Sequence, residues 1–597
     1  MTESSSADGS RSEGGAGDGG DDSATPSMDP LLAQLGAEYW DLALEASPLS
    51  ATLLGVHDHD DRLTDLSLEV EQDHRRDLDL LRTRAATIDP AGSSLNDRVT
   101  RSLLLYELDT GIDAADLRLV EMASDQMIGP HAELLMVAAQ LSYPEPALAE
   151  AALIRYSQIP RMLGQALDRF RAGLSAGRTP AQVVIGRSIH SLDGYLASDM
   201  GTDPFMATGL PGTWDGADGW RDEMADMVRD RIRPAFAMYR DVLRDEIAPL
   251  ARPDDRAGWC WLPDGDELYA ALIRAHTSIS TTPQSLHDLG VGLTEQTLPE
   301  EYRIVAGRWS AGVGGPAGLD TTDLQAIFAH LRSDPGLRHH DEAEIIELAE
   351  RSVQRATAAI PEWFGRLPVA ACAVTPIPDF LAADAPYAYY FPPAIDGSRP
   401  GTYFINTADP ESSSRAEAES IAFHEAIPGH HLQIAISQEL EGVAEFQRHG
   451  GSTAYIEGWA LYAERLADEM GLYSDDVALL GMLTADSWRS ARLVVDTGLH
   501  ALGWSRQQAL DYFEANTPVP MEQVAGEVDR YLAMPAQALS YKVGHLEIQR
   551  LRSAAESRLG DRFDLPAFHD VVLGSGAVTL PVLADLVEAW VEHSATD

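Results

Sequence analysis

The chain has 597 residues, of which 94 are acidic and 44 basic, so its formal net charge at pH 7 is −50. A surface with this charge repels phosphate backbones and anionic lipids, so nucleic-acid and membrane partners are not expected. Two cysteines, Cys260 and Cys372, are too few for a disulfide framework, and no stretch of sequence approaches a membrane span.

Three regions follow from the pattern along the chain. Residues 1–28 are mostly Gly, Ser and Asp, without the basic start or apolar core of a signal peptide. We interpret them as a disordered acidic tail of a cytoplasmic protein. Residues 29–255 predict a helical N-terminal region, because apolar residues recur at helical spacing, as from Ile159 to Leu174. Residues 256–597 are predicted to form the catalytic region.

The stretch from His57 to Asp61 alternates histidine with aspartate, which is a pattern that metal sites can show. In a loop that follows a glycine, such alternation is more often found in a solvated turn. We therefore predict a turn here rather than a metal site.

Two short β-prone segments interrupt the helical pattern of the second region. They are Val369–Val374 and Thr402–Asn406, and prolines and glycines separate them. Helices are predicted to resume near Ser414 and to continue, with loops, to the end of the chain.

The strongest chemical motif begins at His424-Glu425 and continues to His430 and His431. Zinc hydrolases use imidazole ligands together with a carboxylate that does not bind the metal but takes a proton from water. On an unbroken helix, His430 would lie about 120° around the axis from His424 and could not share an ion with it. Pro428-Gly429 can break the helix and bring His430 back, or can swing His431 inward instead. A capped helix end with surface histidines is the alternative.

A second helical segment supplies a third candidate ligand. Glu457 lies 27 residues after His430. Two histidines and a glutamate are a known ligand set of catalytic zinc sites, which leave the fourth position open. Glu464, two turns after Glu457, either orients a ligand or is a solvated charge on the helix surface.

Lysine is almost absent from the chain, which has 43 arginines and the single lysine Lys542. We infer that this position needs a compact ammonium group, although chance retention of one lysine is the alternative.

Two of these stretches, His424–Gln433 and Tyr455–Glu464, together resemble the bacterial DUF885 family. Ser540–Gly544 and Arg492–His500 also fit its pattern, and the resemblance extends over nearly the whole chain after the first 28 residues. One departure is Ala536, where the family more often has glycine. The resemblance implies a mainly α fold: a large helical, zincin-like metallopeptidase body with a small β-sheet beside the zinc helix.

The expected function is that of a zinc-dependent hydrolase of peptide bonds, such as a carboxypeptidase or dipeptidase acting on short peptides. His424, His430 and Glu457 are the predicted Zn²⁺ ligands, and Glu425 is the predicted general base. Zincin-like folds pair an edge strand with the substrate backbone, which makes Thr402–Asn406 the candidate edge.

Six further site residues are predicted, and their roles depend only on motif position. Tyr541, and more weakly His500, are the predicted donors to the oxyanion. Arg492 or Lys542 is predicted to pair with a substrate carboxylate. Tyr403 and Asn406, on the candidate edge strand, are predicted to contact the substrate.

Two alternatives to a peptidase stay open. The same metal site can serve a hydrolase of a non-peptide amide or another C–N bond. The chain can also be a non-catalytic helical metal-binding protein, although a purely structural zinc would not need Glu425. The sequence does not predict the oligomeric state.

Overall fold

In a computed structural model of the protein, the described residues are 28–312, 315–377, 382, 386–395, 397 and 399–596. The predicted acidic tail lies outside them, except for Met28. Helices dominate these residues, with one small sheet of three strands. The prediction of a mainly α fold with a small β-sheet is therefore confirmed.

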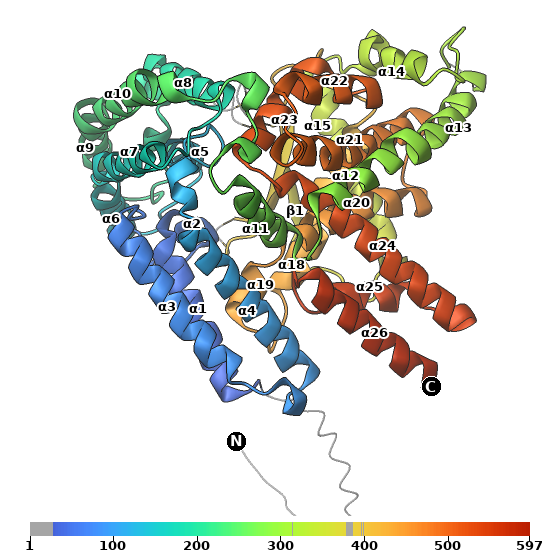
Figure 1. Cartoon of the computed structure of the whole chain (residues 1–597), viewed down its shortest axis with the longest axis horizontal. Helices are drawn as coiled ribbons and strands as arrows, with labels where there is room; N and C mark the ends of the chain where they lie inside the picture. Colours follow the sequence, from blue (N-terminus) through green and yellow to red (C-terminus); the bar gives the residue numbers. More distant parts are fainter. Residues whose placement is uncertain are drawn as a thin grey trace, which may run out of the picture.

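The described part of the N-terminal half contains ten α-helices, which form the left side of Figure 1. Several begin with proline at the first helical position, where a missing N–H does no harm. Their bounds are α1 Pro30–Ala46, α2 Pro48–Leu54, α3 Leu68–Ala86, α4 Leu95–Asp116, α5 Pro130–Ala138, α6 Pro146–Tyr156, α7 Ile159–Ser175, α8 Gln182–Ala197, α9 Ala217–Met227 and α10 Arg233–Val242.

The later helices form the right side of Figure 1, with α20, α21 and α24 near its centre. Their bounds are α11 Gly265–Thr277, α12 Pro283–Gly292, α13 Leu298–Ala311, α14 Leu324–Ser333, α15 Glu342–Ala359, α17 Ala418–Glu425, α18 His430–Gln438, α19 Glu445–His449, α20 Thr453–Glu469, α21 Asp476–His500, α22 Arg506–Asn516, α23 Met521–Ala533, α24 Ser540–Leu559, α25 Leu565–Leu573 and α26 Leu580–Thr596.

The sheet consists of β1 (Cys372–Pro376), β2 (Ala388–Phe391) and β3 (Gly401–Ile405), in the order β1-β3-β2. Strand β3 pairs with β1 in parallel and with β2 antiparallel. The segment Thr402–Asn406 was predicted to be the edge strand, and this prediction is wrong. Strand β2, which was not predicted, covers the second side of β3, so the edges of the sheet are β1 and β2.

Hydrophobic packing crosses the predicted boundary near residue 255. One buried cluster joins Ala181 and Val184 of the first region to Val495, Phe513 and other residues of the second. The two predicted regions therefore share a core, and the position of a domain boundary stays a prediction.

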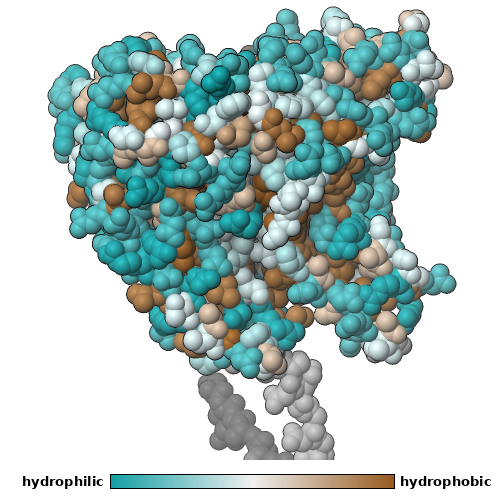
Figure 2. Space-filling model, in the orientation of Figure 1, coloured by the Kyte–Doolittle hydropathy of each residue, from teal (hydrophilic) through white to brown (hydrophobic). Residues whose placement is uncertain are grey.

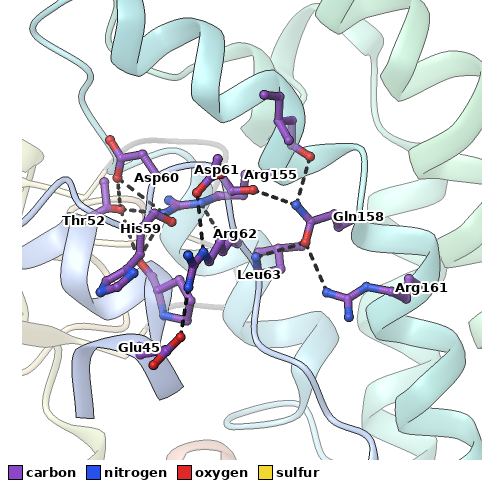
Figure 3. A network of polar contacts seen from close by, with 12 residues as sticks. Glu45, Thr52, His59, Asp60, Asp61, Arg62, Leu63, Arg155, Gln158 and Arg161 are labelled. Carbon is purple, nitrogen blue, oxygen red and sulfur yellow. Dashed lines mark hydrogen bonds and ion pairs between the residues drawn. The ribbon is translucent and has the colours of Figure 1, made fainter. Parts of the chain in front are cut away.

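The turn from His57 to Asp61 contains a buried ion pair. Asp60 is 2% exposed, and its carboxylate accepts hydrogen bonds from Thr52 and Arg155, both of which are also buried (Figure 3). Arg155 also donates to the backbone carbonyls of Arg62 and His59 at 2.9 and 2.8 Å. The predicted turn is present, but Asp60 stabilises it from inside and is not solvated.

The surface agrees with the composition. The face seen in Figure 2 is mostly hydrophilic, with apolar side chains in separate small groups. Among the described residues, no helix has the length and apolar character that a membrane span requires.

Candidate metal centre

The zinc-motif helix is interrupted where the sequence predicts it. Helix α17 ends at Glu425, and α18 begins at His430. Between them the backbone leaves helical geometry, and the His431 N–H donates to the Ala426 carbonyl at 3.0 Å, five residues back instead of four. The predicted break between Ala426 and His430 is confirmed.

Close packing explains why this turn needs its glycine and its neighbours. A Cβ atom at Gly429 would lie 1.9 Å from the His424 carbonyl oxygen, so no side chain fits there. The indole N–H of Trp459 on α20 donates to the Pro428 carbonyl at 2.9 Å. Helix α20, which carries Glu457, therefore also holds the turn.

The turn brings the three predicted ligands together. The rings of His424 and His430 are 4.8 Å apart between centroids and nearly perpendicular. Their Nε2 atoms lie 3.7 and 3.4 Å from Oε2 of Glu457, which has no hydrogen-bond partner although it is buried. One ligand atom from each residue can be chosen so that all three lie within 4.8 Å of one another. Two imidazoles and a carboxylate around one point fit a zinc ion.

Glu464 fixes the orientation of His424. The His424 Nδ1 atom lies 2.7 Å from Oε1 of Glu464, and the hydroxyl of Ser420 donates to the other carboxylate oxygen at 2.6 Å. In the neutral ring, an N–H on Nδ1 leaves the lone pair of Nε2 on the side of Glu457, where it could bind a metal ion. Burial would lower the pKa of His424, but Glu457 and Glu464 beside its two ring nitrogens raise it to about 9. The carboxylates of Glu457 and Glu464 therefore favour a positive charge at His424. Glu464 is 1% exposed and is not a solvated surface charge.

His431 points elsewhere. Its Nδ1 lies 2.9 Å from the Tyr390 hydroxyl on β2, and its Nε2 lies 3.0 Å from the Ala370 carbonyl. His431 therefore connects α18 to the sheet, and His430 is the histidine that lies with His424 and Glu457 at the candidate metal centre.

Glu425 and Tyr541 lie beside the three candidate ligands. Glu425 follows His424 directly and is half-buried, and no described residue bonds or pairs with its carboxylate. The Tyr541 ring lies 6.3 Å from the His424 ring and nearly parallel to it. Burial raises the pKa of Tyr541, and the charge of Glu457 raises it further, so the hydroxyl keeps its proton and can donate it in a hydrogen bond.

Glycines bring the helices that carry Glu457 and Tyr541 into contact. A Cβ at Gly458 of α20 would lie 2.4 Å from the backbone of Gly544 in α24, and a Cβ at Gly544 would lie 1.7 Å from the Ala454 carbonyl oxygen. Only glycine allows the two helices to pack this closely. Gly458 and Gly544 therefore set the positions of Glu457 and Tyr541.

The guanidinium group of Arg492 packs over the Tyr541 ring. Its guanidinium carbon is 4.5 Å from the centre of the Tyr541 ring, and it donates to the Tyr531 hydroxyl at 2.8 Å and to Glu527 at 2.9 Å. These bonds use part of its hydrogen-bonding capacity, and Nη1 has no partner.

The structure gives His500 a different role from the predicted one. Its Nδ1 accepts from the Trp259 N–H at 3.1 Å, and its Nε2 donates to the Tyr531 carbonyl at 3.0 Å. Burial lowers its pKa to about 3, so the ring is neutral and no N–H is left for an oxyanion. His500 supports the backbone.

Lys542 is also occupied within the protein. Its ammonium group pairs with Asp486 and lies 3.2 Å from Nδ1 of His545, and all three residues are buried. Asp486 also pairs with Arg465 at 2.5 Å. The single lysine of the chain therefore serves a buried charge network, and the predicted pairing with a substrate is corrected.

The two residues predicted on the edge strand do not lie on one. Tyr403, in the central strand, is completely buried. The side chain of Asn406 donates to the Ala382 carbonyl at 2.7 Å and accepts from the Ala408 N–H at 3.1 Å, so it holds a loop. Neither residue therefore has the place on an open edge from which its contact with substrate was predicted.

Comparison with known proteins shows the family and the fold. The profile of the family described as "Bacterial protein of unknown function (DUF885)" matches residues 48–587. The chain belongs to the DUF885 family. No curated protein matches this DUF885 chain.

Two solved structures are similar over nearly the whole chain. One is described as "the putative lipoprotein from Colwellia psychrerythraea", with a TM-score of 0.87 and 25% identity, and the match covers 94% of this chain and 99% of that one. The other is "a putative lipoprotein of unknown function from Shewanella oneidensis", with a TM-score of 0.68, 18% identity, and coverage of 93% and 99%. The second shows the fold alone.

Proposed function

We propose that this protein is a zinc-dependent hydrolase of peptide bonds with a zincin-like active site. The convergence of His424, His430 and Glu457, with ligand atoms within 4.8 Å of one another, carries the proposal. The unpartnered Glu457 oxygen and the carboxylate behind His424 support a cation at this point. The nitrogen and oxygen donors favour zinc over the harder ions Mg²⁺ and Ca²⁺.

The residues around this point support hydrolysis. When bound, zinc would lower the pKa of a water molecule and polarise a carbonyl group. Glu425 can take a proton from the attacking water and pass it to the leaving amine, because its carboxylate is held by no other described residue. Tyr541, stacked near His424, can donate a hydrogen bond to the oxyanion. A structural zinc site would need neither residue, which disfavours a non-catalytic role.

The location of the protein is a separate matter. The sequence predicts a cytoplasmic protein, whereas both similar structures are described as lipoproteins. We keep the cytoplasmic location as a prediction, and fractionation of cells that make the native protein would test it.

Replacement of Glu425 by glutamine tests the proposed function. The variant should keep its zinc but hydrolyse N-blocked peptides about 10²–10⁴-fold more slowly, which is the usual contribution of a general base. Glu441→Gln, at an exposed position after α18, is the matched control and should behave like the parent. Hydrolysis by Glu425→Gln at the parent rate, with equal zinc content, would contradict the mechanism.

A further inference from the structure

A buried arginine near the candidate metal centre forms no ion pair with the described residues, although the buried carboxyl of Glu417 interacts with it electrostatically from farther away. Arg489 lies on α21 and is 8% exposed. Its one hydrogen bond within the described chain is long, 3.4 Å from Nη1 to the Ala485 carbonyl of its own helix, and its Nε is buried without a partner. No carboxylate of the described residues lies within ion-pair distance. Burial of an unpaired guanidinium is costly, so such a residue indicates an anion that binds there.

The surroundings of Arg489 also favour an anion. Its guanidinium carbon lies 5.1 Å from the centre of the Trp488 ring and 6.0 Å from that of Tyr541. Arg492 lies against the same two rings, at 4.8 and 4.5 Å. The carboxylate of Glu527 is already shared between Arg492 and Arg530, at 2.9 Å from each. Arg489 and Arg492 thus share these two aromatic rings, and Arg530 pairs with the same Glu527 carboxylate as Arg492, in a chain whose net charge is −50.

The position of Arg489 relative to the metal centre limits the size of the ligand. The Tyr541 ring is 6.3 Å from His424 and 6.0 Å from the Arg489 guanidinium, so that guanidinium is at most about 12 Å from the His424 ring. One residue of extended peptide spans about 3.5 Å, and a charge-assisted hydrogen bond adds about 3 Å. A peptide with one or two residues beyond the scissile bond would therefore reach from the metal centre to Arg489.

We propose that Arg489, with Arg492 beside it, binds the free C-terminal carboxylate of a peptide substrate, so that the protein is a carboxypeptidase. This inference rests on the proposed hydrolase function and adds the substrate class. Arg489 is offered as a binding residue and Arg492 as a positioning residue, because Arg492 is already bonded to Glu527 and Tyr531.

Binding measurements test the proposal without requiring hydrolysis. The zinc-loaded Glu425→Gln protein is titrated by calorimetry with a panel of N-benzoyl dipeptides ending in Phe, Leu, Arg or Glu, each as the free acid and as the C-terminal amide. We expect at least one acid to bind about ten- to a hundred-fold more tightly than its amide, as a charge-assisted pair implies, and the Glu425→Gln/Arg489→Gln protein to lose this ratio. No preference for any acid, or a ratio that survives loss of Arg489, would overturn the proposal.

Measurements of hydrolysis rates and of melting temperatures test the proposal further. In the enzyme with Glu425 intact, Arg489→Gln should bring the ratio of kcat/KM for acid over amide toward 1. Arg489→Met should not lower the melting temperature, because no ion pair is lost, whereas Arg492→Met should lower it. A lower melting temperature for Arg489→Met with an unchanged ratio would make Arg489 structural.

Arg489-dependent binding without hydrolysis would refute the hydrolase, whereas hydrolysis without preference for acids would refute only the carboxylate site.

Discussion

At the scale of single residues, Glu464 shows how a buried carboxylate can act through a ligand. Its contact with His424 Nδ1 at 2.7 Å fixes which ring nitrogen faces the metal centre. Partners of this kind typically change metal affinity ten- to a hundred-fold. We expect Glu464→Gln to bind zinc more weakly by about this factor in a chelator competition, with an unchanged circular dichroism spectrum. Equal zinc affinity in Glu464→Gln and the parent would show that this contact does not matter.

Asp496 gives a prediction about pH. Burial raises the pKa of Asp496 to about 7, although hydrogen bonds from Tyr269 and from the Ala536 N–H oppose the shift. A carboxyl group with a raised pKa in the folded state stabilises the fold below its ordinary pKa near 4, and this contribution is lost as the pH rises toward 7. The contribution of Asp496 to stability should therefore fall across this range.

Asp496→Asn removes the titration while keeping the shape. In urea unfolding with chelator present, the free energy of unfolding of the variant minus that of the parent should rise between pH 5.5 and 7 and level off above about 8, for a total of a few kcal/mol at most. A difference that is constant with pH would contradict a raised pKa for Asp496.

At the scale of elements, the contact between α20 and α24 positions both Glu457 and Tyr541. Gly544→Ala would place a methyl group 1.7 Å from the Ala454 carbonyl oxygen, so the helices must separate. We expect a loss of about 1–3 kcal/mol in stability and weaker zinc binding. Gly526→Ala in α23 is the matched control, because its Cβ meets nothing within 4 Å, and it should be neutral or stabilising by up to about 1 kcal/mol. Equal effects of the two substitutions would contradict this packing.

The backbone at Ala536 has a conformation that ordinarily favours glycine. Ala536 has a φ of +69°, which is the left-handed region that favours glycine, and its N–H donates to Asp496 at 3.0 Å. The resemblance noted from the sequence implies glycine at this position. This chain therefore adopts the left-handed backbone conformation at position 536 with alanine in place of glycine.

At the scale of the whole molecule, local signals were predictable and distant contacts were not. Pro428-Gly429 predicted the break that brings His430 to His424, because both residues disrupt a helix wherever they occur. His500 and Lys542 were misjudged because their partners are remote in sequence: Trp259 lies 241 residues from His500, and Asp486 lies 56 from Lys542. Strand β2, which pairs with β3, has three β-prone aromatic residues, but it is only four residues long and two prolines follow it, so it was not predicted. Arg489 was missed because an arginine in a helix is ordinarily solvated, and only its burial without an ion pair distinguishes it.

The zinc content of single-ligand variants tests the central claim most directly. By atomic emission, the parent should hold about one zinc per chain, and His424→Ala, His430→Ala and Glu457→Ala should lose most of it, because a three-ligand site is weakened by the loss of any one ligand. His431→Ala removes an adjacent buried histidine bonded to Tyr390 instead, and this control should keep its zinc. Zinc retained by His430→Ala or Glu457→Ala, or lost from His431→Ala alone, would contradict the metal centre described above.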